Sequence, residues 1–500
     1  MSIFSSDIFI VSFLYSEATP KIIFICIPSS LASPTQASSL IMEYRQQHSI
    51  SDSQVKIQPR LIIHGGAGNI LRSNFPADKY AAYRSSLLSI VSKTRDYMNS
   101  PTHSEKHLSN HPSALEIATH AVAQLEDNPL FNSGHGAVFT RDGINELEAS
   151  VMVSRGFKKR GVGVMGLRRV RNPILLARKM LEHGERDLAP AGSVPSSSSF
   201  SSLLLDMDVD ESVNGNGGLN VPSAQGHTQL HGQTAEQLAQ MYGLEMVDPK
   251  YFFTQQRWDE HVRALEREQN GLSSGTWHAQ EYLPQGTCGA VALDADGVIC
   301  AATSTGGMTN KLTGRIGDTP VVGAGFWAEE WDEEGLEGLV EGARPGVSFV
   351  GPLKGLLADC FPTPWMYSPA GQFVPSSSTR CMGFSGTGNG DSFLRVNAVR
   401  TVAAIARYKP ITGSKALAKV AGPGGELQKS AGDRWGRTGE GEGGIIGIEC
   451  VLERDEDGSV VGVKSEVLME YNCGGMYRAW IDDDGEAVMS IWSNGSADEL

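Results

Sequence analysis

The chain has 500 residues, of which 40% are hydrophobic and 20% charged, enough for one large core or two to three ordinary domains. The formal net charge is −15, and the acidic residues are spread along the chain, which argues against the basic stripe that nucleic-acid binding requires. No apolar run reaches the roughly 18–20 residues of a membrane span. We therefore expect neither a nucleic-acid nor a membrane partner.

Seven cysteines occur without any C-x-x-C pair, which argues against a zinc ribbon and against a disulfide framework. We therefore expect a reducing compartment and a cytoplasmic protein. Two short apolar runs near the N-terminus are interrupted by charged residues and proline, and no basic n-region precedes them. Residues 1–59 are expected to be a disordered extension, a weak targeting segment, or sequence that precedes a true start at Met42.

The first organised elements follow this extension. A buried strand is predicted from Arg60 into the small-residue loop His64-Gly-Gly-Ala-Gly. Apolar residues at helical spacing predict a helix over 113–125, which Asn128-Pro129 ends.

The middle of the chain alternates between low-complexity and ordered segments. A Ser- and Gly-rich stretch at about 189–226 is interpreted as a disordered insertion. Helices are predicted over 234–242 and 253–269. Thr287 to Thr303 then has the pattern of a hairpin that turns at Ala295-Asp-Gly.

Two further insertions are predicted in the second half of the chain. Residues 327–379 are acidic and contain prolines, and we interpret them as a long excursion. Residues 413–443 are rich in Gly, Lys and Glu, and we interpret them as a surface loop. Strands near 460–471 and 487–493 are expected to close the fold.

The hairpin begins with Gly286-Thr-Cys-Gly, a pattern that is weak alone, because an ordinary strand can also start with threonine. A threonine hydroxyl inside a chain is a poor nucleophile. If the bond between Gly286 and Thr287 breaks, the freed α-amine has a pKa of about 8 and can act as general base for the hydroxyl beside it. Gly286 has no side chain, so the backbone before the cut tolerates strain.

Arg315 and Asp318 form an Arg-x-x-Asp pair after the hairpin. A guanidinium fork suits the carboxylate of an amino-acid substrate, and a carboxylate suits its ammonium group. A surface salt bridge is the alternative interpretation. The run Gly386-x-Gly-x-Gly has neither the Rossmann spacing nor the Gly-Lys-Ser/Thr of a phosphate loop, so no nucleotide cofactor is expected.

Taken together, these patterns resemble the plant-type asparaginases, also called isoaspartyl peptidases. The resemblance extends from about residue 60 to the C-terminus, outside the insertions. It rests on five blocks in the order of that family: His64-Gly-Gly-Ala-Gly; Asn128-Pro-Leu-Phe-Asn-Ser-Gly-His-Gly-Ala-Val-Phe; Gly286-Thr-Cys-Gly continued by Thr303-Ser-Thr-Gly-Gly-Met-Thr-Asn-Lys-Leu-Thr-Gly-Arg-Ile-Gly-Asp-Thr-Pro; Ser385-Gly-Thr-Gly-Asn-Gly-Asp-Ser-Phe; and Tyr471-Asn-Cys-Gly-Gly-Met-Tyr-Arg-Ala-Trp.

The resemblance implies an α/β fold, the four-layer αββα sandwich of N-terminal nucleophile hydrolases, in which two antiparallel sheets pack face to face between helical layers. It also implies self-cleavage between Gly286 and Thr287. The products would be an α chain, residues 60–286, and a β chain, residues 287–500, with two such pairs forming a dimer.

The resemblance further implies a role for each matching residue. The catalytic residues would be Thr287, Thr305, Thr387 and Gly388; the substrate-binding residues Arg315, Asp318 and Gly390; and the supporting residues Asn132 and His64. Thr305 would hydrogen-bond the nucleophile, and Thr387 and Gly388 would form the oxyanion hole. For His64, a structural loop histidine is an equal alternative.

The implied substrates are asparagine and β-aspartyl dipeptides, and the implied reaction needs no redox or nucleotide cofactor. The family also carries a sodium ion held by backbone carbonyls near the loop of Asn132. Side chains do not locate such a site, so the metal site is left open.

Two departures from the family pattern leave the substrate open. Val153 stands where the family usually has Asp, at a position that we expect near the rim of the active site. The spacing from Asp318 to Thr387 is also longer than usual by some tens of residues. The alternatives are a glycosylasparaginase, a taspase-like threonine endopeptidase, or an uncleaved relative that acts as a binding or scaffold protein.

Overall fold

The computed structural model describes residues 55–101, 111–189, 222–270, 286–333, 377–409, 411–455 and 457–492, together with two strands nearer the N-terminus. The chain divides into two units, and the second begins at Ile57. In the first unit, β1 (Phe9–Leu14) pairs antiparallel with β2 (Lys21–Cys26), where the sequence had predicted a disordered extension. The remaining residues before position 55 lie outside the described ranges.

The second unit is a mixed α/β structure that contains two sheets. The order across the larger sheet is β14 (Ala487–Ser490), β13 (Gly475–Ile481), β3 (Arg60–Gly68), β7 (Cys288–Leu293), β8 (Ile299–Thr305), β4 (Leu147–Val153), β5 (Gly161–Leu167) and β6 (Gln229–His231). Its neighbours are antiparallel except β5 and β6. The order across the smaller, antiparallel sheet is β12 (Val460–Tyr471), β11 (Gly443–Arg454), β10 (Ser377–Gly388) and β9 (Phe326–Glu333).

An apolar layer joins the two sheets because successive residues of a strand point to opposite faces. In β3, Ile62 packs with residues of both sheets, including Val291 of β7 and Ile446 of β11. Its neighbours Leu61 and Ile63 belong to a separate core cluster on the other face of the larger sheet. The larger sheet is therefore covered on both faces.

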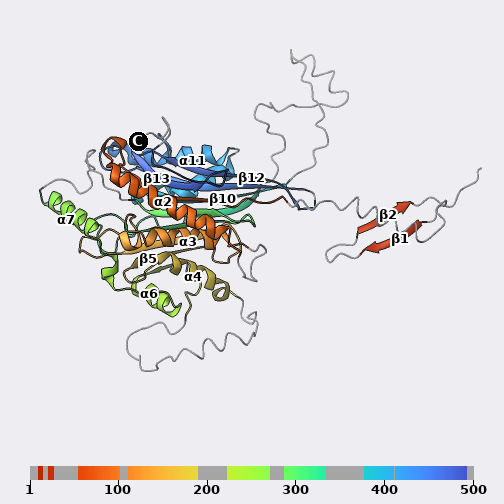
Figure 1. Ribbon diagram of the computed structural model, residues 1–500, viewed down its shortest axis with the longest axis horizontal. Helices are drawn as coiled ribbons and strands as arrows, with labels where there is room; N and C mark the ends of the chain where they lie inside the picture. The colour runs from red at the N-terminus through yellow and green to blue at the C-terminus, as the bar shows by residue number, and fades with distance from the viewer. Residues whose placement is uncertain are drawn as a thin grey trace, which may run out of the picture. The chain divides into compact units, whose positions relative to one another are not determined.

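Helices cover the outer face of each sheet. The cluster on the larger sheet contains residues of α2 (Ala77–Met98), α3 (Ala114–Glu126) and α4 (Pro173–Asp187). The cluster on the smaller sheet contains residues of α9 (Gly390–Val396), α10 (Ala398–Tyr408), α11 (Gly413–Ala421) and α12 (Glu426–Ala431). In Figure 1, α11 lies on the opposite side of the strands from α3 and α4.

Several elements predicted from the sequence are confirmed. Helix α3 begins after Ser113, whose hydroxyl caps the Glu116 amide while the Glu116 side chain accepts from the Ser113 amide. The other two predicted helices are α6 (Gly232–Met241) and α7 (Gln255–Gln269). β7 and β8 form the predicted hairpin, and Gly297 takes the positive φ of 78° that its turn requires.

The prediction of a surface loop over 413–443 is wrong. Residues 413–421 and 426–431 form α11 and α12, and Leu417 and Leu427 are buried in the core beneath them. The excursion predicted over 327–379 also includes parts of β9 and β10 at its two ends. Residues 334–376 lie outside the described part of the chain, as does 190–221 of the earlier insertion. No helix in the described ranges combines the length and apolarity needed to cross a membrane.

Candidate active site

The predicted nucleophile lies where the central hairpin of the larger sheet opens. Cys288 pairs with Ser304, so Thr287 and Thr305 occupy the next position along β7 and β8. Both threonines are buried. The Thr305 hydroxyl accepts a hydrogen bond from the Gly307 amide at 3.0 Å, and within the described residues no hydrogen bond joins it to Thr287.

A residue that the sequence did not single out lies closer to the nucleophile. The Thr319 hydroxyl is 3.5 Å from that of Thr287, at the outer limit of hydrogen bonding. Thr319 is fully buried, and its carbonyl accepts from the Ser150 hydroxyl at 2.7 Å. Its place directly after Asp318 in a matching block was the signal that could have identified it.

The predicted cleavage site packs against the end of β3, where the sequence had predicted a loop from His64 to Gly68 and the structure has strand. A Cβ atom on Gly286 would lie 2.0 Å from the Cα atom of Gly66 and 2.7 Å from the Ala67 amide nitrogen. Gly66 itself has a φ of +121°, which other residues rarely adopt. The peptide between Gly286 and Thr287 therefore rests directly on the backbone of Gly66 and Ala67.

This close packing makes a steric prediction. Gly286→Ala should slow self-cleavage by about a hundredfold, because displacement of the scissile bond by about 1 Å has effects of this size on reaction rates. Gly68→Ala is the matched control, since a Cβ at Gly68 meets nothing within 4 Å. The fraction cleaved is followed with time on denaturing gels. Equal rates for the two variants would contradict the packing argument.

The predicted oxyanion residues are linked to the same end of β3. The Thr387 hydroxyl oxygen accepts from the Ala67 amide at 3.2 Å, which leaves the hydroxyl proton available to donate. Gly388 follows with a φ of +148°, and a Cβ there would lie 2.4 Å from the Glu442 carbonyl oxygen. A hydroxyl and an amide from neighbouring residues are the kind of donors that can stabilise a developing negative charge.

The three predicted substrate-binding residues lie together. A Cβ on Gly390 would be 2.6 Å from Asp318 Oδ1 and 3.0 Å from Arg315 Nη2, so glycine is required for these groups to meet. Arg315 also contacts Asp391, with 3.2 Å between Nη2 and Oδ1. A carboxylate and a guanidinium side by side can receive the ammonium and the carboxylate of one amino acid.

Asp318 is poorly satisfied without a ligand. The residue is 4% exposed, and among the described residues its Oδ2 atom has no hydrogen-bond partner. Burial raises the pKa of Asp318 to about 7, although Arg315 acts in the opposite direction. A cationic ligand would donate a hydrogen bond to Oδ2 and bring a second positive charge to the Asp318 carboxylate.

Two glutamates from the start of β4 hold the segment that carries Arg315 and Asp318. Glu146 Oε2 accepts from the Gly314 amide at 2.7 Å, and Glu148 Oε1 accepts from the Gly317 amide at 3.2 Å. Lys311 Nζ lies 3.6 Å from Glu148, and both side chains are 1% exposed. The segment that carries Arg315 and Asp318 therefore rests on a buried ion pair.

Breaking this buried pair should destabilise the protein. Glu148→Ala removes the ion-pair partner of the buried Lys311 ammonium and leaves it the hydrogen bond to the Glu146 carbonyl, so we expect a loss of about 3–5 kcal/mol in the free energy of unfolding. The double variant Glu148→Ala/Lys311→Met should recover part of it. Glu453→Ala is the control, because its pair with Lys464 is exposed and should contribute less than about 1 kcal/mol. Urea unfolding measures all three, and a double variant no more stable than Glu148→Ala would contradict this account.

The supporting residues occupy interior positions. Asn132 accepts from the Val138 amide at 3.0 Å and donates to the Gly307 carbonyl at 2.7 Å, so it fixes the turn that follows Thr305. His64 is fully buried, and burial lowers its pKa to about 3. Within the described residues, neither side chain forms a hydrogen bond with the Thr287 hydroxyl.

The prediction that Val153 lies near the rim of the active site is wrong. Val153 pairs with Cys300 at one end of β4, whereas Glu148 pairs with Thr305 at the other. The five steps between them span about 17 Å at a rise of about 3.4 Å per residue. Val153 is buried in the apolar core, so it is not at the rim of the site.

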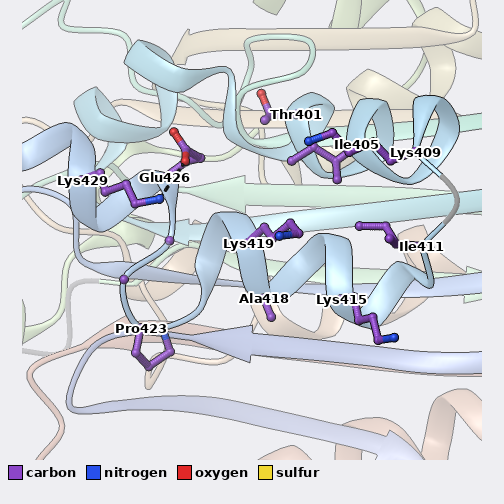
Figure 2. A pocket seen from close by; sticks show the side chains of 12 residues that line it. Thr401, Ile405, Lys409, Ile411, Lys415, Ala418, Lys419, Pro423, Glu426 and Lys429 are labelled. Carbon is purple, nitrogen blue, oxygen red and sulfur yellow. Dashed lines mark hydrogen bonds and ion pairs between the residues drawn. The ribbon is translucent and has the colours of Figure 1, made fainter.

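A separate groove lies on the helices of the smaller sheet. It runs between α10 and α11 and contains none of the predicted site residues; Figure 2 shows its lining: Thr401, Ile405, Lys409, Ile411, Lys415, Ala418, Lys419, Pro423, Gly424, Gly425, Glu426 and Lys429. Within the described ranges, no three His, Cys, Asp or Glu residues are arranged to hold a metal ion. A sodium site made of backbone carbonyls is of another kind, and it stays a prediction.

Comparison with known proteins identifies the family of this chain. The sequence model of the family described as asparaginase matches residues 57–193 and 220–332. The isoaspartyl peptidase of Escherichia coli (strain K12) is 30% identical over 420 residues, which cover 84% of this chain and 92% of that protein. The chain belongs to the asparaginase family. As a member, the enzyme is an amide hydrolase, and the matched ranges include Thr287, Arg315 and Asp318.

Other relatives support the same assignment. The probable isoaspartyl peptidase/L-asparaginase 2 of Arabidopsis thaliana is 26% identical over 460 residues, or 86% of this chain and 98% of that protein. The plant-type L-asparaginase of Pyrococcus furiosus is 31% identical over 286 residues, or 56% of this chain and 74% of that protein. The similarity to the first extends over most of both chains.

Proposed function

We propose that this asparaginase-family enzyme cleaves itself between Gly286 and Thr287, and that Thr287 then hydrolyses the side-chain amide of asparagine and of β-aspartyl dipeptides. The observation that carries the proposal is the packing of Gly286 on Gly66 and Ala67, because the Ala67 amide also holds the Thr387 hydroxyl. The scissile bond and the oxyanion donors thereby meet at the same end of β3.

The maturation step follows from these positions. The Thr287 hydroxyl attacks the Gly286 carbonyl carbon, and the bond from this carbon to the Thr287 nitrogen breaks. The hydroxyl proton passes to the nitrogen, which leaves as the α-amine of Thr287, and the Gly286 carbonyl is then joined to the Thr287 side-chain oxygen as an ester. Water hydrolyses the ester and leaves a carboxylate on Gly286. The α-amine is then beside its own hydroxyl and can take the proton from it, which activates the nucleophile.

The turnover step uses the same hydroxyl. Arg315 and Asp318 hold the carboxylate and the ammonium of the substrate, and Thr287 attacks the side-chain amide carbonyl. The Thr387 hydroxyl and the Gly388 amide stabilise the oxyanion. Ammonia or an amine leaves with the proton taken by the Thr287 amine, and water releases aspartate from the acyl-enzyme.

We infer that the fold is the αββα sandwich of N-terminal nucleophile hydrolases and that the fragments stay together after cleavage. Strand β3 of the first fragment is hydrogen-bonded between β13 and β7 of the second, and β4 pairs with β8 across the cut. Separating them would expose a central strand. A dimer of such pairs is part of the proposal and is measured by the mass of the native particle.

The test combines a denaturing gel with a three-substrate assay. The purified full chain should yield two bands, and N-terminal sequencing of the smaller should begin Thr-Cys-Gly. A native gel-filtration peak should contain both fragments. The cleaved enzyme should hydrolyse asparagine or a β-aspartyl dipeptide and leave a glycosylated asparagine and protein substrates intact.

Each alternative function has its own outcome. Preference for a glycosylated asparagine would indicate a glycosylasparaginase, and cleavage of a protein substrate would indicate a taspase-like endopeptidase. A single full-length band after prolonged incubation, without hydrolysis of any substrate, would overturn the proposal and favour a binding or scaffold protein.

A further inference from the structure

A buried polar network connects the two sheets behind the nucleophile. The Ser385 hydroxyl of β10 lies 2.8 Å from the Thr303 hydroxyl of β8 and 2.8 Å from His64 Nε2 of β3. All three residues are fully buried. Burying polar groups in an apolar interior costs free energy unless they form hydrogen bonds with one another. We therefore ask what this cluster between the sheets does.

The backbone next to Thr287 is shaped around this network. Gly289 lies two residues after Thr287 on β7, on the same face of the strand, and pairs with His64. A Cβ on Gly289 would lie 2.1 Å from the Ser385 hydroxyl and 2.4 Å from His64 Nε2. The network therefore packs on β7 beside the nucleophile, in space that only glycine leaves open.

The hydrogen bonds in the network have a defined direction. Burial keeps His64 neutral, so one ring nitrogen donates and the other accepts. Among the described residues, no group forms a hydrogen bond with Nδ1, while the Thr287 backbone lies near enough to the ring to raise its pKa against the effect of burial. A proton on Nδ1 leaves Nε2 to accept from Ser385, and the Ser385 oxygen to accept from Thr303.

Resting on the proposed function, we propose that Thr303, Ser385 and His64 form a one-way chain of hydrogen bonds that ends at the Thr287 backbone and sets the nucleophile against the oxyanion hole. His64 has its proton on Nδ1. In the uncleaved chain this donor faces the Thr287 backbone without a hydrogen bond. Cleavage frees the start of β7, and the Thr287 carbonyl becomes the acceptor.

The positions of these residues on their strands explain why such a chain of hydrogen bonds would affect catalysis. Thr303 is two residues from Thr305 on β8, and Ser385 is two residues from Thr387 on β10. His64 precedes the Gly66 and Ala67 pair on β3. The chain thus fixes the distance between Thr287 and Thr387, whereas it touches neither Arg315 nor Asp318. The three residues are positioning residues, and their loss should change kcat more than KM.

The kinetic test uses two variants and one matched control. Ser385→Ala and Thr303→Val each interrupt the chain, and we expect kcat to fall at least tenfold with KM within twofold of the parent. Thr303→Ser restores the hydroxyl and should recover kcat. Ser154→Ala removes a buried serine at the opposite end of β4, whose hydroxyl only accepts from the Ile299 amide, and should leave kcat unchanged. Ser385→Ala and Thr303→Val enzymes that match Ser154→Ala in kcat would overturn the proposal.

A spectroscopic test does not depend on self-cleavage. Nitrogen-15 spectra of histidine-labelled protein, assigned with His64→Gln, should show one neutral ring with its proton on Nδ1 between pH 5 and pH 8. Ser385→Ala should shift the Nε2 signal of that ring. A proton on Nε2, or a protonated ring in this range, would overturn the inference. If the wild-type chain does not cleave itself, the proposed function fails. The spectra still test the hydrogen-bond network, because they do not require cleavage.

Discussion

Thr287→Ala should give a single full-length band on a denaturing gel and no measurable hydrolysis of asparagine or a β-aspartyl dipeptide. The variant lacks the hydroxyl that attacks the Gly286 carbonyl, so neither the ester nor the free α-amine forms. Removing a nucleophile of this type lowers kcat by at least about a thousandfold. Incubation of the purified variant for days, followed by the gel and an ammonia-release assay, measures both effects.

The control for this variant retains the hydroxyl. Thr287→Ser keeps the attacking oxygen and loses one methyl group, so it should cleave itself more slowly and keep measurable turnover. Circular dichroism should be the same for Thr287→Ala and the parent, because Thr287 immediately precedes β7 and, within the described residues, its hydroxyl makes one long hydrogen bond, with Thr319. Hydrolysis by Thr287→Ala at the parental rate would refute the assignment of the nucleophile.

Part of this site could be predicted from spacing alone. Thr287 and Thr305 flank a hairpin whose turn is visible in the sequence, so their proximity follows from antiparallel pairing. Thr319 could not be found this way. It approaches Thr287 only because its segment folds back along β4, where the Ser150 hydroxyl holds its carbonyl. The resemblance assigned roles to the motif residues but did not give this contact.

The fold shows a similar limit. Residues 413–443 contain glycines that suggest a loop, but these glycines lie mainly at helix ends and turns, and alanines and leucines between them pack on the smaller sheet. The expectation for Val153 came from the resemblance to the family pattern, and it failed because a match of motifs does not give which end of β4 faces the site. The strand register places Glu148 at that end instead.

Asp318 should make substrate binding depend on pH near neutrality. Its pKa is raised to about 7 by burial, so the carboxyl is increasingly protonated and neutral as the pH falls below 7. Only the carboxylate attracts the substrate ammonium. KM for asparagine should therefore rise as the pH falls, by about tenfold for each unit well below the pKa, and level off above pH 8.

Asp318→Asn tests this directly, because it keeps the shape of the side chain and removes the charge. Loss of a buried charge partner costs about 2–5 kcal/mol, so KM should rise by at least about thirtyfold, and its pH dependence near 7 should disappear. Asp391→Asn is the control: Asp391 also contacts Arg315, but its side chain is 63% exposed, so the dependence should persist. The Thr287 amine also titrates near this range, but its protonation removes the general base and so affects kcat. Calorimetric titration with the product aspartate isolates binding from this step, and an affinity that keeps its pH dependence near 7 in Asp318→Asn would assign it to another group.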